Sequence, residues 1–64
     1  MKVYRINTSG REYEYWYDPQ YRAWYAAEVD QYGNLGESVN EYTKDDILKT
    51  IRSGMVPSIP KYEK

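Results

Sequence analysis

Ring-bearing and aliphatic residues alternate with polar ones through the first half of the chain, which is the pattern of half-buried β-strands. Three segments show it, and each ends at a cluster of turn-forming residues. They read "KVYRI", "EYEYWY" and "RAWYAAEV". We therefore predict strands over residues 2–6, 12–17 and 22–29. A fourth segment, residues 37–42, has a single valine between polar neighbours, so it predicts at most a short edge strand.

Several local signals agree on one helix over residues 44–53. Thr43 is a good N-cap, and Asp46 three residues later fits a variant of the capping box. One apolar stripe follows, made by Ile47, Leu48 and Ile51. Tyr42 is expected to pack on Ile47 as a hydrophobic staple, and Gly54 supplies the left-handed residue that ends the helix.

The order of these elements predicts an α+β fold. We expect an antiparallel meander of three strands, or four if the weak segment pairs, with one C-terminal helix packed on one face. Residues 1–55 would form this single domain, and residues 56–64 an extended tail whose prolines exclude a helix. The tail either packs Val56 and Ile59 over apolar surface or presents a proline-bearing ligand to another protein. Packing is favoured, because aliphatic residues are few elsewhere.

Composition then narrows what such a domain can do. The chain has 64 residues, no Cys and no His, so it lacks the usual thiolate and imidazole metal ligands and nucleophile–base pairs. We expect no enzymatic activity, no metal and no cofactor. The formal net charge of −1 argues against strong non-specific binding to nucleic acid or to an anionic membrane. With no long apolar run and no leader, the protein is expected to be soluble and cytoplasmic.

Aromatic residues are frequent in this chain, which has nine Tyr, two Trp and no Phe. Because neighbouring strand residues point to opposite faces, the consecutive rings at residues 15–17 and 24–25 must occupy both faces of the sheet in any register. A single short helix covers only one face. The sequence therefore predicts an open face that carries aromatic side chains.

Which rings share a face depends on the length of the turn between the second and third strands. A turn with an odd number of residues brings Asp18 opposite Arg22. It also pairs Trp16 with Trp24. The odd-numbered residues of both strands would then face the helix: Tyr13, Tyr15, Tyr17, Ala23, Tyr25, Ala27 and Val29. We favour this register because it leaves the charged positions outside. A four-residue turn, "DPQY", would instead join Trp24 to the tyrosine face of the second strand, and Trp16 to Tyr25.

On the favoured register the outer face carries a candidate binding surface, formed by Arg5, Glu14, Trp16, Arg22, Trp24 and Glu28. Trp, Tyr and Arg are over-represented at the energetic centres of protein interfaces. We therefore interpret the chain as an interaction module that binds a protein partner, or a second copy of itself as a homodimer. In the alternative without a ligand, the two indoles stack on each other beneath charged stems and stiffen a small sheet.

Nucleic-acid binding is the second functional hypothesis. "WYAAEVDQYGN" followed by "YTKDDIL" resembles, in the order of elements, a plant family of DNA-binding domains and the arm-binding domains of tyrosine recombinases. That resemblance implies a sheet lying in the major groove. Such a sheet would be basic, whereas the outer positions here are as acidic as they are basic, so phosphate contacts would be weak. Trp and Tyr could instead stack on unpaired bases, helped by Arg contacts.

Overall fold

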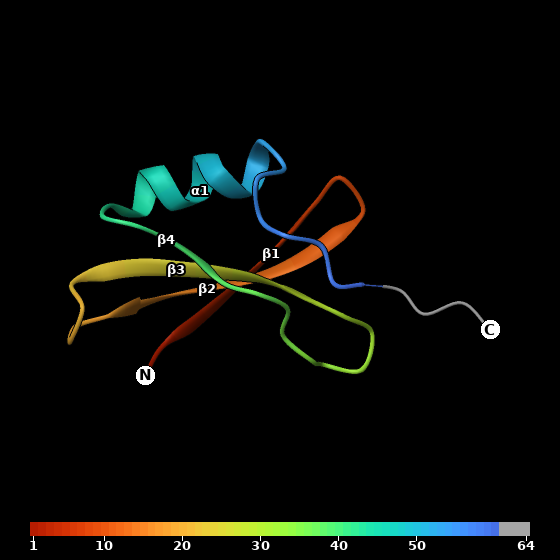
Figure 1. Ribbon diagram of the computed structural model, residues 1–64, viewed down its shortest axis with the longest axis horizontal. Coiled ribbons are helices and arrows are strands. Elements are labelled where there is room, and N and C mark those ends of the chain that lie inside the picture. The colour runs from red at the N-terminus through yellow and green to blue at the C-terminus, as the bar shows by residue number, and fades with distance from the viewer. Residues whose placement is uncertain (61–64) are drawn as a thin grey trace.

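The computed structural model, which describes residues 1–60, shows an antiparallel sheet with one helix on one of its faces (Figure 1). The elements are β1 (Val3–Thr8), β2 (Arg11–Asp18), β3 (Ala23–Val29), β4 (Val39–Glu41) and α1 (Lys44–Arg52). The four strands neighbour one another in chain order. The predicted α+β meander is confirmed, and the weak fourth segment forms a short edge strand. Within the described residues, no helix is long and apolar enough to span a membrane.

A two-residue turn joins β1 to β2. Ser9 and Gly10 both have positive φ, 56° and 74°. This is the backbone of the tight hairpin turns that match the twist of paired strands. The turn is therefore shorter than the predicted "NTSG", and Asn7 and Thr8 extend β1 by pairing with Glu12 and Arg11.

Residues 19–22 connect β2 to β3, and this even number sets the pairing. Trp16 pairs with Tyr25, and Tyr17 pairs with Trp24. The register that we favoured, which required a turn with an odd number of residues, is therefore wrong. The pairing expected from a four-residue turn is confirmed. The turn itself consists of residues 19–22 instead of 18–21. Arg22, predicted to start the third strand, has a φ of 52° and closes the turn. Asp18 supports the turn by accepting a hydrogen bond from the backbone N–H of Gln20 at 2.9 Å.

The core lies between the helix and the middle of the sheet. Ile47 and Ile51 of α1 pack in one cluster with Ala26 of β3, and all three are fully buried. The single methyl group of Ala26 leaves room for the helix to approach. We predicted this role for Ala23 and Ala27, which instead lie on the opposite face, because the register differs by one residue. Tyr13 of β2 is 2% exposed and completes the cluster from the neighbouring strand.

Both ends of the helix follow the sequence signals. The Thr43 hydroxyl accepts a hydrogen bond from the backbone N–H of Asp46 at 3.1 Å. After the last turn, Gly54 adopts a φ of 76°, which a residue with a Cβ rarely accepts. The predicted staple is wrong, because Tyr42 is 81% exposed while Ile47 is buried.

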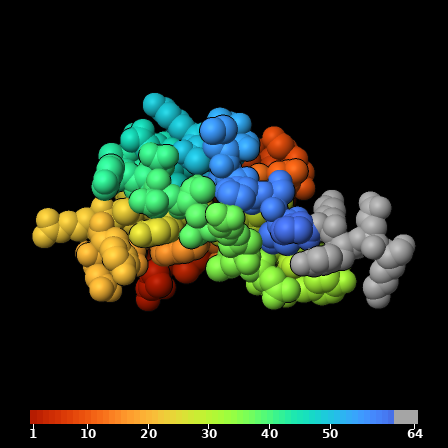
Figure 2. Space-filling model, viewed as in Figure 1, coloured from red at the N-terminus to blue at the C-terminus, as the bar shows by residue number. Residues whose placement is uncertain are grey.

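The segment after the helix folds back against the sheet, so the packing interpretation of the tail is confirmed for residues 56–60; residues 61–64 lie outside the described residues. Val56 belongs to the core cluster. The backbone N–H of Ile59 donates to the Glu28 carboxylate at 2.7 Å. Gly36 approaches so closely that a Cβ there would lie 2.7 Å from Cγ1 of Ile59. In Figure 2 the blue C-terminal segment accordingly lies against the green segment between β3 and β4.

Substituting Ile47, a fully buried residue of α1, with smaller side chains should test the core. A domain of this size has only about 3–5 kcal/mol of net stability. We expect Ile47→Val to lower the free energy of unfolding by about 1 kcal/mol, and Ile47→Ala by about 2–5 kcal/mol, in urea titrations followed by circular dichroism. Met55→Ala is the control, since Met55 is exposed. A loss for Ile47→Val as small as that for Met55→Ala would contradict this description of the core.

Acid should open the turn after β3. Hydrogen bonds from the backbone N–H of Asn34, and then of Tyr32, hold the pKa of Asp30 below its ordinary value of 3.8. Because the folded pKa is depressed, the stabilisation is present above the ordinary value and is lost as the pH falls through the folded value. An NMR titration that follows the Asn34 amide should give a midpoint below 3.8. Asp30→Ala should speed hydrogen exchange of that amide and leave that of Ile51 unchanged, whereas a midpoint above the ordinary value would contradict the expectation.

Candidate functional site

The densest group of rings lies on the side of the sheet that carries the helix. It consists of Tyr4, Tyr15, Tyr17 and Trp24, which we call the aromatic cluster. Tyr4 pairs with Tyr15 across β1 and β2, and Tyr17 pairs with Trp24 across β2 and β3, so all four side chains leave the same face. The Tyr4 and Tyr15 rings stack at 5.2 Å with an interplanar angle of 17°. Trp24 is the hub, because its ring lies within 6.2 Å of each of the three tyrosine rings.

This cluster is only half covered by the helix. Four strands make a sheet roughly 19 Å wide, whereas one helix covers about 10 Å. α1 packs over β3 and β4. On the helix side of β1 and β2, Tyr13 is buried in the core cluster, so the surface beside α1 is open only around Tyr4, Tyr15 and Tyr17. Tyr17 is the most exposed ring of the aromatic cluster, at 39%. The remaining rings are half-buried, held in place by one another and by the core.

Two lysine side chains frame the open surface. The Nζ atom of Lys44, the first residue of α1, lies 5.1 Å from the centre of the Tyr4 ring and 5.9 Å from that of Trp24. The Nζ atom of Lys2 lies 5.3 Å from the same Tyr4 ring. At these distances an ammonium group is attracted to the negative face of the ring. Among the described residues, neither lysine has a carboxylate within ion-pair distance.

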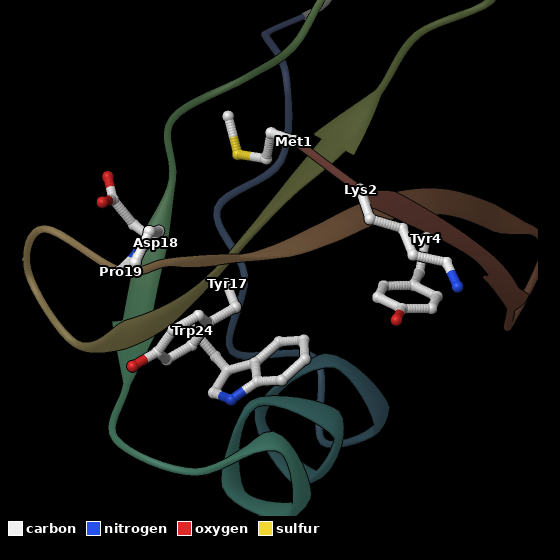
Figure 3. A pocket seen from close by; sticks show the side chains of 7 residues that line it. All are labelled: Met1, Lys2, Tyr4, Tyr17, Asp18, Pro19 and Trp24. Atoms are coloured by element: carbon white, nitrogen blue, oxygen red, sulfur yellow. The ribbon is translucent and has the colours of Figure 1, made fainter.

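An open cavity of about 520 Å³ lies at the end of the sheet where these side chains meet (Figure 3). It is lined by Met1, Lys2, Tyr4, Tyr17, Asp18, Pro19 and Trp24. Figure 3 shows the Tyr17 and Trp24 rings next to each other, with Tyr4 and Lys2 to one side of them and Asp18 to the other. The volume is within the range of small ligand sites. An apolar floor with charged groups at its rim can hold an apolar side chain whose neighbours are polar.

On the opposite face of the sheet, aromatic and charged side chains interact with one another. Trp16 and Tyr25 stack with ring centres 6.0 Å apart and an interplanar angle of 12°. Arg5 donates a hydrogen bond to Glu14 and lies 3.5 Å from Glu12. The hydrogen bond to Glu14 raises the pKa of the Arg5 guanidinium. These rings and charges therefore have partners within the sheet itself.

The structure does not bring the six predicted site residues together. Arg5, Glu14 and Trp16 share the face opposite the helix. Trp24 and Glu28 lie on the helix side instead, because the register differs by one residue from the favoured one and exchanges the faces of β3. Arg22 lies in the turn. The predicted stacking of Trp16 on Trp24 is wrong, and a role of the six residues in binding stays a prediction.

Glu28 contacts both Arg11 and the C-terminal segment. Besides the Ile59 amide, its carboxylate lies 3.8 Å from the Arg11 Nε atom, and Arg11 also donates to the Ser58 hydroxyl. Glu28 and Arg11 therefore hold the C-terminal segment on the sheet.

Sequence reasoning missed Lys2, Tyr4 and Lys44. The alternation in "KVYRI" already places Lys2, Tyr4 and Ile6 on one side of a strand, which is the signal that could have found two of them. Lys44 could not be placed without knowing which half of the sheet the helix covers.

Comparisons with protein-family models, with curated proteins and with solved structures find no match for this chain. The part of the chain that the structure describes also holds no group of three or more His, Cys, Asp or Glu side chains placed to bind a metal ion. What the site can do must therefore follow from its own geometry.

The two tryptophans should differ in their effect on stability. Trp24 packs against the core, whereas Trp16 packs on Tyr25 at the opposite face. We expect Trp24→Ala to lower the free energy of unfolding by about 3 kcal/mol. Trp16→Ala should cost about 1–2 kcal/mol, because it removes one stacked pair and part of a half-buried ring. Urea unfolding of both variants measures the difference, and the reverse order would contradict the observed register.

Proposed function

We propose that this domain is a binding module without enzymatic activity, and that its aromatic cluster docks a protein partner. The observation that carries the proposal is the partly open helix side of the sheet, where the rings of Tyr4 and Tyr17 line a cavity. The ammonium groups of Lys2 and Lys44 lie beside these rings. A domain this short buries little surface, so leaving rings uncovered there forgoes stability that a second covering element would provide. A partner that covers the rings recovers that stabilisation on binding.

The residue types at the site suit protein recognition. Tyr and Trp offer large contact areas and lose little side-chain entropy when fixed. The rings here are already held by their neighbours, with Tyr17 and Trp24 tilted by 54° at 5.5 Å, so the surface is formed before a partner arrives. Lys2, Lys44 and Asp18 at the rim would set the orientation of the partner.

Single-stranded nucleic acid is the second candidate, and one observation favours it. Rings next to ammonium groups, as at Tyr4 with Lys2 and Lys44, are what bases and phosphates require. The charge around the site speaks against it, because Asp18 lines the same cavity and Arg5 and Arg11 are bound to carboxylates. A phosphate backbone would thus meet few free cations.

Tyr17→Ala should separate binding from folding. Tyr17 lies outside the buried core, so its removal should leave the melting temperature nearly unchanged and weaken partner binding by about tenfold or more. The measurement is capture of partner proteins from an extract of the host, with immobilised wild-type, Tyr17→Ala and Tyr32→Ala domains. Tyr32 is 78% exposed in a distant turn and serves as the control.

Retention of the same proteins by Tyr17→Ala would refute the proposed site. Two further measurements test whether the partner is a second copy of the chain or a nucleic acid. Sedimentation at high concentration would show a dimer if a second copy is the partner. Binding of labelled single-stranded oligonucleotides that weakens steeply with salt would favour the nucleic-acid candidate instead.

A further inference from the structure

We propose, building on the function proposed above, that the docked partner element is an amphipathic helix with acidic residues along one flank, lying on β1 and β2 beside α1. This inference rests on the width of the sheet, on the length of the open strip and on the sign of the charges at its rim.

The layer geometry leaves space for one more helix. α1 occupies the half of the sheet formed by β3 and β4. The half formed by β1 and β2 has about the same width, roughly 10 Å, and is open around Tyr15 and Tyr17, whereas Tyr13 is buried in the core. In Figure 1 α1 runs along β3, so a second helix beside it would run along β2. Leu48 is half-buried against the core and lies one helical turn after Lys44, whose ammonium group reaches the Tyr4 ring, so Leu48 would meet a helix placed on that side. Two adjacent helices would then complete the layer.

The open strip matches a short helical contact. From Tyr15 to Asp18, β2 spans about 10 Å, which is roughly two helical turns. Tyr15 and Tyr17 project on the same side with a spacing of about 6.7 Å, close to the rise of about 6 Å between residues i and i+4 of a helix. Apolar residues at i, i+3, i+4 and i+7 of the partner would therefore reach the tyrosines and the cavity beside Trp24.

The two lysines beside Tyr4 favour a partner helix with acidic residues along one flank. Lys2 and Lys44 converge on one ring, at 5.3 Å and 5.1 Å from the centre of Tyr4. Carboxylates along one flank of a docked helix would therefore have ammonium groups to pair with beside this ring. Asp18 lies at the other side of the cavity, so it disfavours a ligand that is negative along its whole length, such as a nucleic acid.

A second copy of this chain does not fit the strip. The only helix of the described chain turns a polar surface outward, because Asp45, Asp46, Lys49 and Arg52 are exposed and its apolar residues are used in its own core. A helix of this kind has no free apolar stripe for the tyrosines. The helix of a second copy therefore does not supply the docked element.

Model peptides test the inference directly. The probes are labelled peptides of about 18 residues, roughly five helical turns: an amphipathic Leu/Glu helix, the same helix with Lys in place of Glu, and a Leu/Glu peptide of identical composition with the stripe scrambled. A single-stranded oligothymidine of similar length is the fourth probe. Fluorescence anisotropy at low salt should show the acidic helix binding at least about tenfold more tightly than each of the others.

Charge reversal provides the decisive comparison. In the double variant Lys2→Glu, Lys44→Glu, the preference should change to the basic helix, and Lys49→Glu on the outward side of α1 should leave it unchanged. Equal binding of the scrambled peptide, strongest binding of the oligonucleotide, no binding of any probe, or a preference unmoved by the double variant would each overturn the inference. Loss of a captured host protein by Tyr17→Ala would still support the proposed function in those cases, so the two failures are distinguishable.

Discussion

The pairing of β2 with β3 determines which aromatic side chains share a face of the sheet. Four residues in the connecting turn place Tyr17 opposite Trp24, and the same register puts Ala26 beneath the helix and Tyr25 beside Trp16. A shift by one residue would exchange the faces of β3. Trp24 would then leave the tyrosines, and the larger side chain of Tyr25 would stand where α1 approaches most closely. One turn thus sets the core and the aromatic cluster together.

The chain builds its core with very few aliphatic side chains. Ile47, Ile51, Val56 and Ala26 are joined by Tyr13, and further rings take over the filling toward the edge of the sheet. Tyr and Trp bring large apolar areas together with a polar group that must reach water or a partner. Rings used in this way remain partly exposed at the margin of the core. The surface proposed for recognition is therefore continuous with the core, and substitutions at Trp24 are expected to change stability together with any binding there.

Sequence patterns predicted most of the fold because the decisive signals were local. The Thr43 cap, the Ile47 and Ile51 stripe and the positive φ of Gly54 each depend on a few neighbouring residues. The register depends instead on the length of the turn, which includes Arg22. Arg22 adopts a left-handed conformation that is uncommon for a residue of its type, and nothing in its side chain signals this. Alternation alone therefore identified the right faces in β2 and the wrong ones in β3. The site followed the register, so Trp24 was assigned to the wrong face and Lys44 was missed.

The two ends of the described chain lie at opposite sides of the domain, with different consequences. Met1 lines the cavity beside Tyr17 and Trp24, whereas the C-terminal segment is fastened far from it by the Glu28 carboxylate and by the close contact of Ile59 with Gly36. Any polypeptide joined ahead of Met1 would start at the mouth of the cavity and compete for it. A fusion or affinity label carried after residue 60 would leave that entrance clear.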